Sequence, residues 1–196
     1  MAGRIQIEVG VEPVASDPVP DAFSDLWSKE RDRQNAAYDA MMRTTAQPVP
    51  WAYDVWAEVI GNLGHTDNHN RAIASQILCN LAASDPEKRI LNDLPTLLEV
   101  TRDKRFVTAR HCLQSLWKIG LTGPEQRAAI VTALATRFKD SEPEKNCTLI
   151  RYDIVIGLRN LHKATDDETI AQQALSLIET EPDLKYRSKY TKGWRQ

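Results

Sequence analysis

The strongest constraint on the fold of this chain is an apolar pattern that occurs three times at nearly constant spacing. In each copy, three apolar residues stand at i, i+4 and i+7, which places them on one face of an α-helix. A Ser or Thr follows each copy, and these residues are about 38 and 43 positions apart, as in helical repeats. The three faces are Ala74, Leu78 and Leu81; Cys112, Leu116 and Ile119; and Ile154, Leu158 and Leu161.

Each Ser or Thr has a Glu three residues later, which is the pattern of a capping box at the start of a second helix. Pro86 and Pro124 are expected in the first turn, where the N–H that proline lacks is not needed. Pro95 predicts a kink or a late restart in the first of these helices, with Asp93 as a candidate cap. The capping boxes are Ser84 to Glu87, Thr122 to Glu125 and Thr165 to Glu168, and the second helices are residues 90–100, 128–138 and 170–178.

Upstream of the repeats, a long helix is predicted over residues 23–43 and a shorter one over residues 51–63. In the shorter helix, Trp56, Val59, Ile60 and Leu63 are expected to point inward. Together the two helices predict a degenerate first pair, because the end unit of an array must cover its open core. The chain is therefore expected to be all-α, with one domain over residues 23–196 and an extended tail and Pro-rich linker over residues 1–22.

The run Arg71 to Leu81 resembles a HEAT repeat, as does the run Arg151 to Leu161, and Thr108 to Gly120 is similar in its ending. The resemblance covers about residues 66–181. The chain is also similar to small bacterial HEAT-repeat proteins. It implies a right-handed α-solenoid, armadillo-like in architecture, with about four helix pairs and a C-terminal helix. Ala109 stands where the other two runs have Arg, which weakens any ladder of arginines between repeats.

The resemblance also implies a non-catalytic scaffold for protein–protein interaction, with a protein partner that the sequence does not identify. In such arrays the second helices usually line the concave face, which is the expected binding surface. The candidate binding residues on that face are Asn92, Glu99, Arg102, Thr132, Thr136, Arg137, Gln172, Gln173 and Ser176.

The N-terminal residues Ile5, Ile7, Val9 and Val11 alternate with polar residues or glycine, which is the period of a β-strand. Two interpretations remain open. The segment is either an extended tail on the first helices or an edge strand that pairs with a second copy to form a homodimer.

The C-terminal residues 184–196 contain five basic residues and no acidic one, and three aromatic residues stand at i, i+4 and i+8. One interpretation is a final helix that packs its aromatic side chains on the last repeat. The alternative is a basic surface for phosphates and stacked bases. The candidate patch is Lys185, Arg187, Lys189, Tyr190, Lys192 and Trp194, and Tyr186 completes the aromatic row.

The composition, with 42% hydrophobic and 27% charged residues, is that of a folded protein rather than a disordered one. The net charge of −2 gives no general support for nucleic-acid binding, which we disfavour. No secretory signal or membrane span is recognised, so we expect a cytoplasmic protein with no membrane contact. The three cysteines are widely spaced, which predicts neither disulfides nor a zinc site.

No residue is assigned a catalytic role, and no metal or cofactor is expected. Asp67 between His65 and His69 is interpreted as a helix cap, and Cys112 beside His111 as a core residue, because adjacent helical residues do not face each other. The alternative function is nucleic-acid binding, including a DNA glycosylase for alkylated bases. Its candidate residues are Trp117, Asp153, Arg110, Arg151, Arg102, Lys104 and Arg105, none of which matches that family's motif.

Overall fold

The computed structural model describes residues 18–195, and every regular element in that range is helical, which confirms the all-α class. Three short 3₁₀ helices extend or follow the α-helices. The elements are α1 (Ala22–Asp25), α2 (Arg31–Thr44), α3 (Ala52–Asn62), α4 (Asn68–Leu81), η1 (Ala82–Ser84), α5 (Arg89–Glu99), η2 (Val100–Arg102), α6 (Phe106–Ser115), η3 (Leu116–Leu121), α7 (Pro124–Asp140), α8 (Cys147–Thr165), α9 (Glu168–Glu179) and α10 (Leu184–Arg195).

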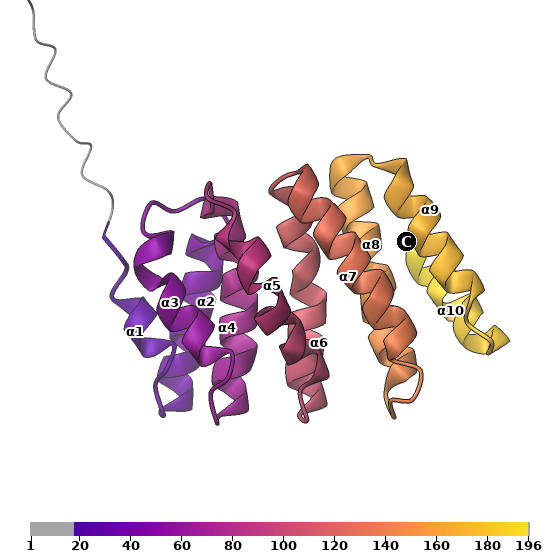
Figure 1. Ribbon diagram of the computed structural model, residues 1–196. Coiled ribbons are helices and arrows are strands. Elements are labelled where there is room, and N and C mark those ends of the chain that lie inside the picture. Colours follow the sequence, from indigo (N-terminus) through magenta and orange to yellow (C-terminus); the bar gives the residue numbers. More distant parts are fainter. Residues whose placement is uncertain (1–17, 196) are drawn as a thin grey trace, which may run out of the picture.

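The longer helices lie in two layers that run along the molecule (Figure 1). In the first layer, α2, α4, α6, α8 and α10 contact one another in that order. In the second layer, α3, α5, α7 and α9 do the same. The chain passes from one layer to the other at almost every turn, so consecutive helices belong to opposite layers.

One apolar core lies between the layers and extends from Phe23 to Tyr190. Each of the nine residues of the three predicted helix faces is at most 1% exposed. Burying an aliphatic side chain of this kind contributes about 1.5–3 kcal/mol relative to leaving it in water. The repeated i, i+4, i+7 pattern therefore identifies the residues that hold the first layer against the second.

The three predicted capping boxes are wrong, because their hydroxyl groups bond elsewhere. Thr122 Oγ1 donates to the carbonyl of Ile119 (2.9 Å), and Thr165 Oγ1 donates to that of Leu161 (2.8 Å). Ser84 Oγ instead accepts from the N–H of Val49 (2.8 Å). Ser and Thr side chains readily bond carbonyls three or four residues back, and here that option closes the preceding helix.

Aspartates cap several of the helices instead. Asp85 accepts from the N–H groups of Arg89 and Ile90 at the start of α5, so Pro86 lies in the turn before that helix and not inside it. Asp167 caps α9, and Asp67 caps α4 as predicted. Pro124 is the first residue of α7, also as predicted.

The predicted helix over residues 23–43 is interrupted between α1 and α2. At the break, Ser28 Oγ accepts from the N–H of Glu30 (3.1 Å), and the Gln34 side chain donates to the carbonyl of Leu26 (2.8 Å). These side chains bond backbone groups that a continuous helix would have paired internally, so the chain turns there. The helix predicted over residues 51–63 is α3, with Val59 fully buried and Ile60 partly buried.

Pro95 does not delay or restart α5, which runs continuously from Arg89 to Glu99. Pro95 lies on the exposed side of the helix, where water can bond the carbonyl that lacks an N–H partner. Asp93 does not cap a restarted helix, since its carboxylate accepts a hydrogen bond from the Trp56 indole (2.8 Å).

The alternating segment over residues 5–11 lies outside the described residues, so both interpretations of it stay predictions. Within residues 18–195, no helix is both long enough and apolar enough to cross a membrane. The C-terminal segment forms α10, which packs against α8 and α9.

Candidate functional site

A pocket lies at one rim of the molecule, and we call it the rim pocket. Three separate segments form it: the loop between α2 and α3, the turn from α4 through η1, and η3. Its volume is about 810 Å³, in the range of small-molecule sites. The lining is Thr45, Ala46, Val49, Pro50, Tyr53, Cys79, Asn80, Ala82, Ala83, Ser84, Asp85, Pro86, Trp117, Lys118, Leu121 and Thr122.

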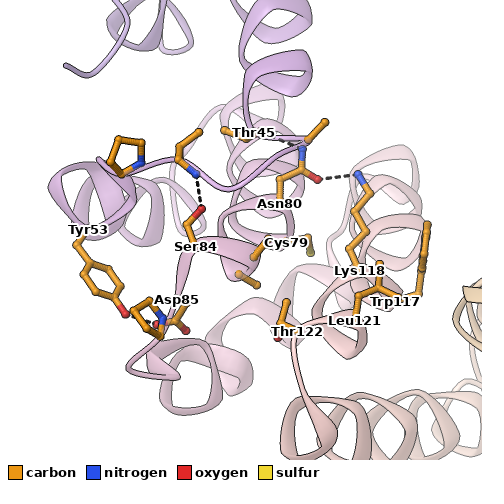
Figure 2. A pocket seen from close by; sticks show the side chains of 16 residues that line it. Thr45, Tyr53, Cys79, Asn80, Ser84, Asp85, Trp117, Lys118, Leu121 and Thr122 are labelled. Atoms are coloured by element: carbon orange, nitrogen blue, oxygen red, sulfur yellow. Dashed lines mark hydrogen bonds between the residues drawn. The ribbon is translucent and has the colours of Figure 1, made fainter. Parts of the chain in front are cut away.

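A chain of hydrogen bonds orients the polar groups on one side of the rim pocket (Figure 2). Thr45 Oγ1 donates to the carbonyl of Met41 (2.7 Å) and accepts from Asn80 Nδ2 (3.0 Å). The oxygen of the same amide, Asn80 Oδ1, accepts from Lys118 Nζ (2.7 Å). The Thr45 hydroxyl thus determines which end of the amide faces Lys118.

Lys118 is half-buried, and burial lowers the pKa of its amine. Among the described residues no carboxylate forms an ion pair with Lys118, whose hydrogen-bond partner is the neutral amide of Asn80. Burial in turn raises the pKa of the Cys79 thiol to about 12, so the thiol is uncharged near neutral pH. Lys118 therefore has no anionic partner among the described residues.

On the opposite wall of the rim pocket, the polar groups of Tyr53 and Asp85 are bonded within the chain. Tyr53 Oη donates to Asp85 Oδ1 (2.6 Å), and both oxygens of Asp85 also accept from the start of α5. Figure 2 shows this pair across the pocket from Lys118. The buried Asp85 carboxylate accepts three hydrogen bonds within the chain, whereas the Lys118 amine donates one, so Lys118 has more free hydrogen-bonding capacity.

Sequence reasoning named Trp117 only in connection with the glycosylase alternative, and it named neither Asn80 nor Lys118. A signal was present, because Lys118 lies in an apolar run between Trp117 and Ile119. The pocket itself could not be predicted, since it depends on three turns meeting at one rim.

The predicted binding residues of the second layer fall into two groups. Most lie on the exposed side of α5, α7 and α9, with Gln173 partly buried; they are Asn92, Glu99, Thr132, Thr136, Gln172, Gln173 and Ser176. Arg102 is also exposed but pairs with Asp140 (2.9 Å).

Arg137 does not lie on an open face, contrary to the prediction. It is 3% exposed and binds Glu144 (2.6 Å) and the carbonyl of Thr101 (3.0 Å). The guanidinium of this α7 residue thus bonds both η2 and the turn after α7, so its role is structural.

The predicted C-terminal patch also contains residues that are engaged within the fold and residues that are exposed. Tyr190 is fully buried, and its hydroxyl donates to the carbonyl of Thr148 (3.0 Å). Trp194 stacks on His162, and Arg187 donates to the carbonyl of Glu181. These three residues hold α10 on the neighbouring helices and are not a free binding surface. The exposed members of the predicted patch are Lys185, Lys189 and Lys192.

Several residues of the glycosylase alternative are paired within the chain, whereas Lys104 and Arg105 are exposed. Asp153 is buried and accepts two hydrogen bonds from Arg110 (2.7 and 2.9 Å), while Arg151 pairs with Glu181 (2.8 Å). Trp117 and Asp153 line different hollows. The Asp153 carboxylate is therefore held as a structural ion pair.

The remaining candidate groups behave as core and cap residues. Cys112 is fully buried, and burial raises the pKa of its thiol well above the ordinary value. His65 accepts from the N–H of Asp67 (3.0 Å) within the turn before α4. In the part of the chain that the structure describes, no three His, Cys, Asp or Glu side chains cluster as a metal site would require.

No protein-family model matches this chain, and a search of curated proteins finds no significant relative.

Proposed function

We propose that this chain is a HEAT-type, right-handed α-solenoid of about four helix pairs plus a C-terminal helix. The separation of its tertiary hydrogen bonds supports this. Gln34 bonds Asn70 across 36 residues, Lys118 bonds Asn80 across 38, and Arg110 bonds Asp153 across 43. These separations match the spacing of the sequence repeat, as expected when each unit stacks on the next one.

We propose that the solenoid serves as a non-catalytic scaffold for protein–protein interaction, through the exposed side of the second layer. The observation that carries this proposal is the absence of charge at the central turns of two of its helices, α7 and α9. No charged residue occurs in α7 between residues 128 and 136, or in α9 between residues 169 and 178. We call the exposed residues of these turns, with those of α5, the uncharged stripe: Asn92, Pro95, Thr96, Ala128, Thr132, Thr136, Gln172, Leu175 and Ser176.

The lack of charge on the uncharged stripe suits the centre of a protein interface, where charged residues are depleted. Leu175, on α9, is 44% exposed and adds apolar surface to the stripe. Charged residues stand at the helix ends, including Glu99, Lys139 and Glu179. An uncharged centre with a charged rim is the arrangement expected of a surface that a partner covers.

The charge distribution favours this proposal over nucleic-acid binding. Two arginines of the second layer that could contact phosphates, Arg102 and Arg137, are paired with Asp140 and Glu144. A phosphate backbone would have to displace these carboxylates, which reduces the gain from neutralising phosphates.

The test is a pull-down from the source lysate with and without nuclease, using the wild type and two double variants. Thr132→Arg with Gln172→Arg places charge on the uncharged stripe. Ala36→Arg with Ala164→Arg, at exposed sites of α2 and α8, adds the same charge to the first layer.

We expect a stoichiometric protein partner that survives nuclease and binds the wild type and the first-layer variant, but not the stripe variant. Partners that disappear with nuclease, or that bind both variants equally, would refute the proposal.

A further inference from the structure

The surface of the rim pocket is mostly apolar, and hydrogen bonds within the chain orient several of its polar groups. Apolar side chains come from all three segments, and Trp117 and Leu121 supply the largest surfaces on the η3 side. Leu121 is 43% exposed at this rim, so apolar surface continues from the pocket to solvent. Small-molecule sites combine such a lining with a small number of directed polar groups.

Lys118 is the group that gives the pocket a preference among ligands. An ammonium group has three N–H donors, and Asn80 Oδ1 accepts one of them. Burying a charge is costly unless a counter-charge or hydrogen bonds compensate for it. The other pocket residues do not supply that compensation, since Asp85 lies across the pocket with both oxygens bonded and Cys79 carries an uncharged thiol.

We propose that the rim pocket binds a small apolar monocarboxylate whose carboxylate pairs with Lys118 and whose apolar body lies against Trp117 and Leu121. The carboxylate would accept the free N–H bonds of Lys118, and Asn80 would hold the amine in position. This site is distinct from the uncharged stripe, and the inference does not rest on the scaffold proposal.

Lys118 favours a ligand with one negative charge over a ligand with two, because Asp85 already places a carboxylate across the pocket. One ammonium group balances one negative charge, whereas the second charge of a dicarboxylate or phosphate would be buried without a partner. A volume of about 810 Å³ accommodates a bicyclic aromatic or a medium-length aliphatic acid.

The test is calorimetric titration of the full chain with naphthalene-2-carboxylate and with naphthalene-2-carboxamide, which has the same shape and no charge. We expect the carboxylate to bind at least roughly tenfold more tightly, the range of one charge-assisted hydrogen bond. Equal binding of the two compounds, or binding of neither, would overturn the proposal.

The Lys118→Met variant tests whether Lys118 causes the preference for the carboxylate over the carboxamide. This variant should bind the carboxylate roughly tenfold more weakly and the carboxamide as before, so that the discrimination disappears. Lys192→Met, at an exposed site on α10, is the matched control and should bind like the wild type. Unchanged carboxylate binding by Lys118→Met would refute the assignment.

Ala83→Trp tests the location without removing a charge. Ala83 is exposed and lines the pocket, so the indole would fill the hollow without disturbing the core. Both compounds should then bind more weakly, and undiminished binding would show that they bind elsewhere. This variant and the wild-type comparison decide the matter even if Lys118→Met does not unfold cooperatively.

A dipeptide with a free C-terminal phenylalanine, acetyl-Ala-Phe, distinguishes a small molecule from the end of a protein chain. We expect it to bind more weakly than naphthalene-2-carboxylate. Tighter binding of the dipeptide would overturn the proposed ligand class in favour of a C-terminal peptide.

Discussion

The two helix layers differ in where they carry charge. In the first layer, Arg110 of α6 reaches Asp153 of α8, and Arg71 and Arg151 each bind an acidic residue that follows a second-layer helix. The central turns of α7 and α9 in the second layer have no charged residue, and the ion pairs of α7 lie at its ends. The first layer thus uses its charged side chains for internal cohesion, and the second layer leaves a surface on which a partner would meet no competing ion pair.

The largest expected effect comes from breaking a buried pair on the charged side of this comparison. Arg151 and Glu181 are separated by 2.8 Å, with side chains 9% and 4% exposed. Arg151→Leu leaves the Glu181 carboxylate buried without its partner, which should cost about 3–5 kcal/mol of unfolding free energy in urea denaturation.

The double variant Arg151→Leu with Glu181→Leu is the control for that experiment. It removes both charges and should recover much of the loss, because no unpaired charge remains. A double variant as unstable as the single one would show that packing, and not the charge, causes the loss.

Alanine substitutions at two glycines, one in close contact with another helix and one without such a contact, test how tightly the helices pack. At Gly120 in η3, an added Cβ would lie 2.7 Å from Leu161 Cδ2 of α8, whose side chain is fully buried. Gly120→Ala should therefore cost about 1–3 kcal/mol. Gly61 in α3 has no atom within 4 Å of the same position, so Gly61→Ala should stabilise the protein by up to about 1 kcal/mol. Thermal denaturation of both variants measures the difference; similar effects would contradict the assigned contact.

Acid should weaken the first layer by a smaller amount. Burial alone would raise the pKa of Asp103, but hydrogen bonds from Arg71 and from the N–H of Arg105 outweigh it and lower that pKa below 3.8. A carboxylate with a lowered folded-state pKa stabilises the fold above its unfolded-state pKa and loses that contribution as the pH falls through the folded-state value.

Melting temperatures measured from about pH 7 down to about pH 2 test this effect. The wild type should lose stability at the acid end, and Asp103→Asn should start less stable at pH 7 but lose less on acidification. Parallel curves for the two proteins would contradict the role of Asp103.

The smallest stability effect is expected on the uncharged stripe. Thr132→Arg with Gln172→Arg changes exposed side chains and should alter the unfolding free energy by less than about 0.5 kcal/mol at each site. Calorimetric unfolding measures this, and a larger loss would mean that these residues support the fold instead of being available to a partner.

The helical class and the inward faces could be predicted because periodicity reports burial directly. All nine residues predicted from the i, i+4, i+7 pattern are buried. The helix starts could not be predicted as reliably. A Ser or Thr near a helix end can cap the next helix or bond the preceding carbonyls, and local sequence does not decide between them, as Thr122 and Thr165 show.

The surface residues were less predictable, because a charged residue can face solvent or a partner within the chain. Arg137 looks like a solvated residue in sequence but is buried against Thr101 and Glu144. The second repeat has Ala109 where the other two repeats have Arg71 and Arg151, each of which pairs with an acidic residue. In the second repeat, Arg137 of the second layer forms a similar pair with Glu144. The rim pocket depends on three distant turns, so no local pattern could predict it.

The sequence separations of the tertiary hydrogen bonds also have a consequence for how the molecule unfolds. Among the described residues, the side-chain hydrogen bond with the longest separation spans 43 residues, from Arg110 to Asp153. Contacts that are limited to adjacent repeats give a low contact order and rapid folding. They also allow one end of the molecule to unfold while the rest stays folded. Amide hydrogens at the two ends should therefore exchange through partial openings that leave α6 closed, so the opening free energy falls stepwise from the middle of the molecule to each end.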